Sequence, residues 1–236
     1  MHLDERLGLA CDLYEACDLA ADIGTDHGYL PLALLESGKC RRMILTDISP
    51  DALDNARSHL ALSRVRDRAQ LRVGSGLEPI EEVCGMISIL GMGGRVIGEI
   101  LEQGADRLRG AKLLLSPHTE PQQVRRAVMK IGYHLEKEIP CRAAGRLYLM
   151  MVAAPGAERL TREEERRGRR LMESGSPLLR DYLTQRLKWT EAQIRGLRTA
   201  RNTGYEGYQE ALARAEADAA YYRQMMEAAG QMHQKV

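Results

Sequence analysis

The chain has 236 residues, of which 44% are hydrophobic and 28% are charged, and its formal net charge is +1 at pH 7. This length suits one sizeable core with a small second domain, and the composition is that of an ordinary globular protein. The sequence shows neither a signal peptide nor an apolar run of about 20 residues, so we expect a cytoplasmic protein without a membrane span.

The first 155 residues alternate between helix-like and strand-like segments. Helical spacing of apolar residues predicts a helix over 3–17, and further helices are expected over 29–36 and after Ser49, an N-cap followed by Pro50. Short apolar runs predict strands, at 19–23, 42–46 and the stretches AQLRV, MISIL and AKLLLS. This alternation predicts an α/β fold with a parallel sheet covered by helices on both faces.

Two further strands, near 132–140 and 146–153, are too close together for a crossover helix, so they are expected to pair antiparallel. The pattern changes at APGAE, and we expect a domain boundary there, giving domains 1–154 and 155–236. In the second domain, two apolar series at heptad spacing flank the turn 202–204. They predict an antiparallel coiled-coil hairpin.

Positive charge gathers on the first helix of this hairpin. Residues 186–201 contain five cations and one acidic residue, Glu191; the cations are Arg186, Lys188, Arg195, Arg198 and Arg201. A solvated helix face and a surface for a polyanion such as RNA both fit this strip.

The stretch LAADIGTDHGYLP carries the most specific signal. Asp22, Gly24, Asp26 and Gly28 form the pattern D-x-G-x-D-x-G between a strand and a helix, where a glycine turn lets a ligand approach the backbone. Asp47 follows 23 residues after Gly24, at the end of the next strand. An acidic residue at about this distance can accept hydrogen bonds from ribose hydroxyls, which favours an adenosine-containing cofactor.

The carboxylate of Asp26 selects among such cofactors. It would repel the pyrophosphate of NAD, whereas the sulfonium and amino groups of S-adenosylmethionine would be attracted. Two glycine clusters, Gly74–Leu77 and Gly91–Gly94, follow the third and fourth strands and belong to the same sheet edge. The predicted cofactor residues are Asp22, Gly24, Asp26, His27, Gly28, Asp47, Ile48, Ser75, Gly76, Leu77, Gly91 and Met92.

These motifs, ADIGTDHGYLP, GSGL and ILGMGG, together with the terminal hairpin, resemble the bacterial tRNA adenine-N1 methyltransferases that modify adenine 22 in the D-arm. The resemblance covers nearly the whole chain. It implies a Rossmann-like domain that binds S-adenosylmethionine, a C-terminal coiled-coil domain, and a tRNA substrate.

Adenine N1 has an in-plane lone pair and no proton, so methyl transfer needs positioning rather than a general base. We expect Asp26 to stabilise the cationic ring and Tyr29 to stack on or border the adenine, as the catalytic residues. Gly93, Gly94, Arg95 and His118 are expected to border the substrate, and the tRNA backbone to contact Arg186, Lys188, Arg195 and Arg198. His59 has no spacing that suggests a metal or a triad, and no metal site is expected.

Three other functions stay open at this stage. One is a small-molecule methyltransferase that uses the hairpin to dimerise, although we expect a monomer. Another is a non-catalytic RNA-binding protein on a methyltransferase fold. A nicotinamide oxidoreductase is disfavoured by Asp26.

Overall fold

The computed structural model describes residues 3–199 and 207–232. The chain divides into two compact units, Met1–Leu171 and Met172–Val236. Arg201 and the predicted turn at 202–204 lie outside the described residues.

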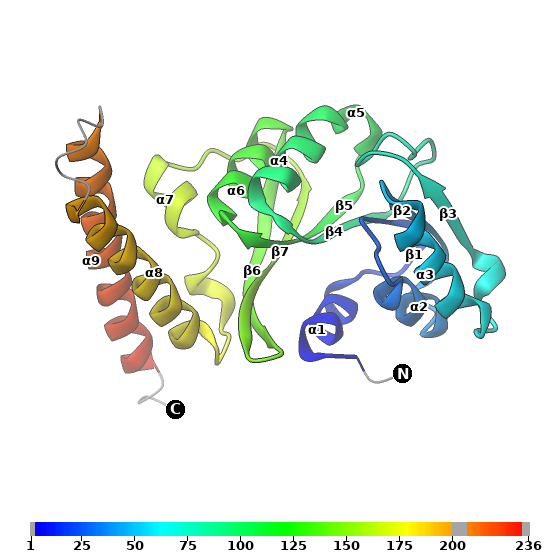
Figure 1. Ribbon diagram of the computed structural model, residues 1–236, viewed down its shortest axis with the longest axis horizontal. Helices are drawn as coiled ribbons and strands as arrows, with labels where there is room; N and C mark the ends of the chain where they lie inside the picture. The colour runs from blue at the N-terminus through cyan, green and yellow to red at the C-terminus, as the bar shows by residue number, and fades with distance from the viewer. Residues whose placement is uncertain (1–2, 200–206, 233–236) are drawn as a thin grey trace. The chain divides into compact units, whose positions relative to one another are not determined.

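The first unit is built on a seven-stranded sheet in the order β3-β2-β1-β4-β5-β7-β6 (Figure 1). Neighbouring strands from β3 to β5 pair parallel, whereas β7 pairs antiparallel with both β5 and β6. This confirms the predicted fold class. The strands are β1 Cys17–Ile23, β2 Cys40–Asp47, β3 Ala69–Val73, β4 Met86–Gly93, β5 Lys112–Thr119, β6 Tyr133–Ala143 and β7 Arg146–Pro155.

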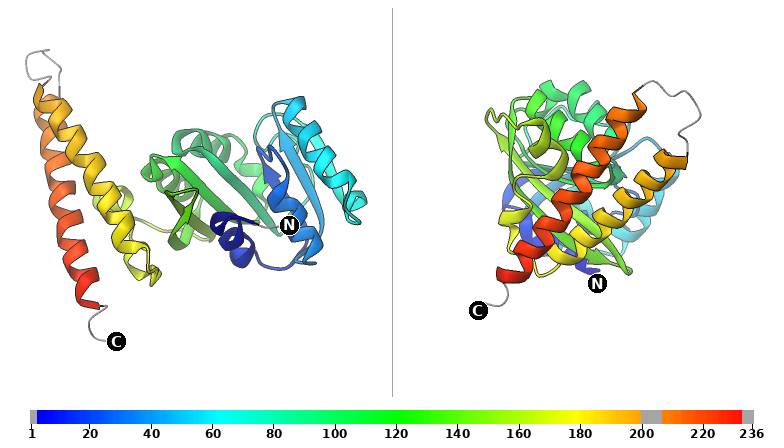
Figure 2. Two further views of the ribbon diagram at one scale, coloured as in Figure 1. Left: turned by 60° about the horizontal axis from the view of Figure 1, so that its bottom comes forward. Right: turned by 90° about the vertical axis from the view of Figure 1, so that its left-hand side faces the viewer.

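Helices cover both faces of this sheet, as the views of Figure 2 show. On one face, α1 (Glu5–Leu13), α2 (Tyr29–Glu36) and α3 (Pro50–Ala61) pack together, and on the other α4 (Gly94–Gln103) packs on α6 (Pro121–Lys130). The short α5 (Ala105–Leu108) and the 3₁₀ turn η1 (Arg66–Arg68) complete the connections. Because crossovers are right-handed, strands added to opposite sides of β1 and β4 place their helices on opposite faces.

Local signals explain where α3 begins, and sheet pairing explains where α1 ends. Ser49 caps α3 by accepting a hydrogen bond from the Ala52 backbone N–H, and Pro50 follows it. The first helix ends earlier than the spacing predicts: Tyr14 is already extended, and Cys17 opens β1 because it pairs in register with Cys40. Sheet pairing therefore overrides the helical spacing at this end.

A buried ion pair holds the segment after β7 to the first unit. Arg125 on α6 donates to Glu138 on β6 at 2.7 Å, and both side chains are buried. The guanidinium also donates to the Glu165 carbonyl at 3.0 Å, and Glu138 accepts from the Arg170 N–H at 3.1 Å. The segment with α7 (Arg162–Arg167) thus packs with the sheet and belongs to the first compact unit, which ends at Leu171.

The second unit contains the 3₁₀ turn η2 (Met172–Ser174) and two long helices, α8 (Leu179–Thr199) and α9 (Tyr208–Met232). Two ion pairs fix their direction, because Glu191 pairs with Arg223 and Arg198 pairs with Glu216. Residues later on α8 thus meet residues earlier on α9, so the helices are antiparallel. Ile194, Ala215 and Ala219 are buried in the seam, as expected for the predicted hairpin.

Candidate active site

A cavity of about 290 Å³ opens at the carboxyl edge of the parallel strands. Its walls come from the ends of β1, β2 and β4, the loop after β3, and α4. Six predicted cofactor residues line it: Gly24, Asp47, Ile48, Ser75, Gly76 and Met92. An adjoining cavity of about 240 Å³ is lined by Ser75 and Gly76 again and by Leu77. The structure therefore brings together the carboxyl ends of four predicted strands.

The turn after β1 is held by backbone hydrogen bonds and by left-handed residues. Gly24 and Thr25 donate their N–H groups to the Thr46 carbonyl at 2.8 and 3.0 Å. Gly24 has a φ of +72°, and a Cβ there would lie 2.0 Å from the terminal methyl of Met92. Gly28, with a φ of +69°, precedes α2 without a side-chain cap, which leaves backbone N–H groups of its first turn free for a ligand.

Asp22 lies behind this turn rather than in the cavity. Its buried carboxylate accepts a hydrogen bond from Ser88 Oγ at 2.6 Å, and the Tyr14 hydroxyl donates to Ser88 Oγ at 3.2 Å. Burial raises the pKa of the Asp22 carboxyl, and the hydrogen bond from Ser88 opposes the rise. Asp22 thus anchors the turn from within, through residues of β4 and of the segment after α1.

Asp47, at the end of β2, faces the cavity. Its Oδ1 accepts the Ser49 backbone N–H at 2.9 Å, and within residues 3–199 and 207–232 no partner is found for Oδ2. The neighbouring Thr46 hydroxyl is buried and also has no partner in that part of the chain. These groups provide the hydrogen-bonding capacity that a nucleoside with free ribose hydroxyls would use.

Asp26 and His27 are on the exposed rim and do not line the cavity. The Asp26 carboxylate is 67% exposed and lies 3.5 Å from His27 Nε2, and its backbone has a φ of +48°. Tyr29 stacks on His59, with ring centroids 4.9 Å apart, and His59 Nδ1 lies 2.8 Å from the His27 carbonyl oxygen. Sequence reasoning missed His59, because its partners are about 30 positions away and nothing local marks it.

The Gly91–Gly94 turn borders the same edge on the other side of the cavity. Gly91 has a φ of +80°, and a Cβ at Gly94 would lie 2.2 Å from the Glu120 carbonyl oxygen. The imidazole of His118, near the end of β5, lies beside Gly91. Arg95 points to a different partner, Glu99, at 3.7 Å on α4.

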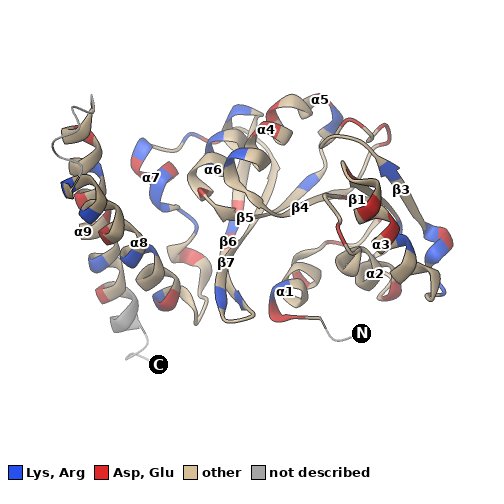
Figure 3. Ribbon diagram, viewed as in Figure 1, with Lys and Arg blue, Asp and Glu red and all other residues tan. Residues whose placement is uncertain are grey.

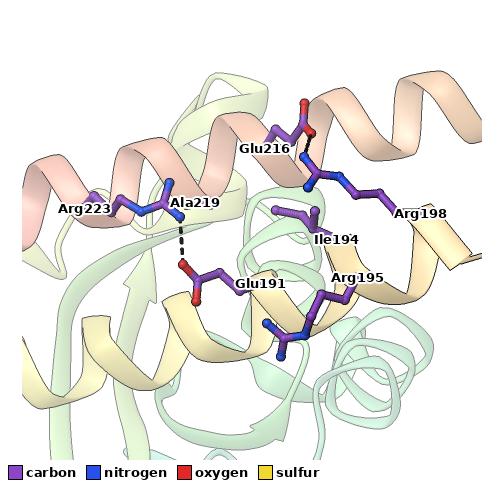
Figure 4. Close-up of a pocket in the computed structure, with 7 residues that line it drawn as sticks. All are labelled: Glu191, Ile194, Arg195, Arg198, Glu216, Ala219 and Arg223. Carbon is purple, nitrogen blue, oxygen red and sulfur yellow. Dashed lines mark hydrogen bonds and ion pairs between the residues drawn. The ribbon is translucent and has the colours of Figure 1, made fainter.

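The hairpin has a groove of its own, with a volume of about 280 Å³ (Figure 4). Arg198 and Arg223 at its edges are each in an ion pair, with Glu216 and Glu191 at 2.7 Å. Arg195 also lines the groove and has no ion-pair partner among the described residues. Arg186 lies over the ring of Trp189, 5.5 Å from its centroid, and Lys188 is exposed. Figure 3 shows both acidic and basic positions along α8 and α9.

The described residues lack two features, a cluster of metal-binding side chains and a membrane-spanning helix. They contain no group of three His, Cys, Asp or Glu side chains that could hold a metal ion. Within the same residues, every helix is too short or too polar to cross a membrane.

Comparisons with known proteins give one family and several relatives. Residues 3–151 match a family described as a methyltransferase domain. The tRNA (adenine(22)-N(1))-methyltransferase of Bacillus subtilis is 32% identical over 158 residues, which are 66% of this chain and 66% of that protein.

Solved structures agree over almost the whole chain. The crystal structure of the B. subtilis m1A22 tRNA methyltransferase TrmK has a TM-score of 0.83 at 25% identity, covering 95% of this chain and 99% of that one. Sp1610 of Streptococcus pneumoniae, solved in complex with S-adenosyl-L-methionine, has a TM-score of 0.81 at 24% identity, covering 94% and 98%.

Proposed function

We infer that this chain, which belongs to the methyltransferase domain family, transfers a methyl group from S-adenosylmethionine to N1 of adenine 22 in tRNA. The inference rests on the cavity at the carboxyl edge of the sheet. Its walls include the turn at Gly24, the acidic residue Asp47 and the glycine loop that follows β3. The named B. subtilis relative supports the choice of substrate. The aligned region spans 66% of that relative, so substrate and partner are proposals for this chain.

The residues at the cavity fit a sulfonium nucleoside. Asp47 faces the cavity and can accept hydrogen bonds from ribose hydroxyls, and Ile48 supplies an apolar wall for an adenine ring. Gly24 makes room for the side chain of Met92, which lines the cavity. The backbone N–H groups at the start of α2 suit a carboxylate. When bound there, S-adenosylmethionine supplies an electrophilic methyl group.

The remaining work of the chain is to position the adenine and to exclude water. We propose that Asp26 and Tyr29 do this from the rim. One face of the Tyr29 ring is covered by His59, so an incoming base stacks on the other face or meets the ring edge. The exposed Asp26 carboxylate is accessible to an adenine that becomes cationic as N1 gains the methyl group.

We also propose that the protein is a cytoplasmic monomer. Its residues 1–154 form the catalytic domain, and residues 155–236 contact the RNA. Light scattering on the purified protein measures the mass, and a dimer would favour the alternative in which the hairpin joins two copies.

The direct test maps modified nucleosides. Protein and S-adenosylmethionine are incubated with an unmodified tRNA transcript, and the digested RNA is analysed by mass spectrometry. We expect 1-methyladenosine at position 22, and none in a matched transcript with guanine at that position. Methylation of small metabolites without transfer to tRNA would refute the proposal, and so would tight tRNA binding without affinity for S-adenosylmethionine.

A further inference from the structure

Two side chains from distant parts of the sequence lie beside Gly91, near the end of β4. A Cβ at Gly91 would lie 3.8 Å from His118 Nε2 and 3.9 Å from Arg6 Nη1. The guanidinium of Arg6, on α1, lies over the ring of Tyr148, 5.2 Å from its centroid. His118 and Tyr148 are also neighbours, with ring centroids 5.3 Å apart. We call Arg6, His118, Arg146 and Tyr148 the Arg6 cluster.

Arg146, the first residue of β7, joins the cluster from beside the turn between β6 and β7. Because β7 runs antiparallel to β5, its first residues lie level with the carboxyl end of β5, where His118 is found. Figure 3 shows basic positions at this turn and on α1. Every member of the cluster belongs to the first compact unit.

Within the described residues, neither Arg6 nor Arg146 has a carboxylate at ion-pair distance. Asp4, the N-cap of α1, and Glu5 precede Arg6 in the sequence, and Asp4 Oδ1 accepts the Leu7 N–H at 2.7 Å. Burial, and then the charges of Arg6 and Arg146, lower the pKa of His118. The imidazole therefore lies in a field that a bound anion would neutralise.

We propose that the Arg6 cluster binds a phosphodiester group of the RNA strand that carries the target adenine; this rests on the proposed function. A nucleotide turned into the site brings a phosphodiester on each side of its ribose, so an anion must lie near the reacting edge. Planar guanidinium groups bind phosphate through paired hydrogen bonds. The cation–π contact with Tyr148 holds Arg6 beside Gly91 before RNA arrives.

Location separates this cluster from the cofactor cavity. None of its members lines that cavity, whose walls include the carboxylates of Asp47 and Glu99. Those carboxylates attract a cationic sulfonium, whereas the two arginines and the histidine of the Arg6 cluster attract an anion. One half of the carboxyl edge is thus acidic and suits the cofactor, and the other half is basic and suits the RNA strand.

The test compares Arg6→Gln and Arg146→Gln with Arg64→Gln as the control. Arg64 is exposed, as Arg146 is, and has no ion-pair partner among the described residues. It lies in the connection that enters β3, at the opposite edge of the sheet. Binding of a tRNA transcript is measured by fluorescence anisotropy over a series of salt concentrations, and binding of S-adenosylmethionine by calorimetry.

We expect each cluster variant to bind tRNA about tenfold more weakly. The slope of log affinity against log salt should fall by about 0.7 to 0.9. Cofactor affinity should be unchanged, and the control should behave as wild type.

Two further measurements distinguish phosphate binding from a structural role. The pKa of His118, followed by NMR, should rise when tRNA binds, and should already be higher in free Arg6→Gln. Arg6→Lys should keep the salt slope, since it keeps the charge, while binding tRNA more weakly than wild type.

Unchanged tRNA affinity and salt slope in both cluster variants would overturn the proposal. Loss of S-adenosylmethionine binding together with tRNA binding would also overturn it, because Arg6 would then maintain the fold. These results are separable from failure of the proposed function. A wild-type protein that leaves adenine 22 unmethylated refutes that function, whereas tRNA binding that depends on Arg6 and on salt would still support the cluster.

Discussion

Gly24 illustrates how one residue connects backbone geometry to ligand binding. Its positive φ favours glycine, and the terminal methyl of Met92 occupies the place that a side chain would need. Because Met92 is flexible and lines the cavity, a Cβ at position 24 would push its thioether into the cofactor space.

We therefore predict that Gly24→Ala weakens S-adenosylmethionine binding and also lowers the free energy of unfolding by about 1–2 kcal/mol. Gly38→Ala is the matched control, since Gly38 has a φ of +75° and nothing within 4 Å of its Cβ position. The control should show the loss of stability alone. Calorimetry and urea unfolding measure the two effects, and equal cofactor affinity in both variants would contradict the role of Met92.

A second prediction concerns Asp22, whose pKa is raised above its ordinary value of 3.8. An acid with a higher pKa in the folded state binds more protons when folded, so the free energy of unfolding falls as pH rises from 3.8 through the raised pKa. Asp22→Asn should remove this dependence and be more stable than wild type at neutral pH.

Urea unfolding at several pH values measures this effect, with the exposed Asp67→Asn as the control. A steep fall in stability with pH that persists in Asp22→Asn would show that another group is responsible.

Among the elements, α6 and β6 are connected by the buried pair of Arg125 and Glu138. Removing one member leaves the other charge without a partner in a dry interior, which costs about 3–5 kcal/mol. Arg125→Met should therefore destabilise the first unit strongly, and the double variant Arg125→Met, Glu138→Leu should recover part of the loss.

The same pair predicts a local effect. Because Arg125 donates to the carbonyls of Glu165 and Arg166, Arg125→Met should release that segment and speed tryptic cleavage within Arg162–Arg167. Cleavage at the wild-type rate, with a loss of stability below about 1 kcal/mol, would mean that the pair does not hold the segment.

At the scale of the whole molecule, we expect arginines of both compact units to contact the same tRNA. In the hairpin groove, Arg198 is paired with Glu216, whereas Arg195 is free among the described residues (Figure 4). A free cation contributes more to phosphate binding than one that must first leave a carboxylate. Arg195→Gln should thus weaken tRNA binding more, and reduce its salt dependence more, than Arg198→Gln. Equal effects of the two substitutions in a salt titration would mean that Arg198 exchanges Glu216 for phosphate without a loss of free energy.

Agreement between sequence and structure is greatest where the signal is local. The glycine turn of 22–28, the cap at Ser49 and Pro50, and the apolar periods of α8 and α9 are read from neighbouring residues. The family resemblance rests on the same stretches, and the family match and the B. subtilis relative confirm it. The roles of individual site residues stay predictions.

The sequence by itself determined the strands, the helices, the antiparallel end of the sheet and the edge at which the motifs meet, because periodicity and turn chemistry are properties of adjacent residues. Only the tertiary structure decided that Asp26 lies on the rim while Asp22 is buried, that His59 supports Tyr29, and that Arg6 reaches Gly91. The contacts of His59 with Tyr29, of Asp22 with Ser88 and of Arg6 with Gly91 join residues 30, 66 and 85 positions apart. They depend on how whole elements pack, and no local pattern encodes that packing.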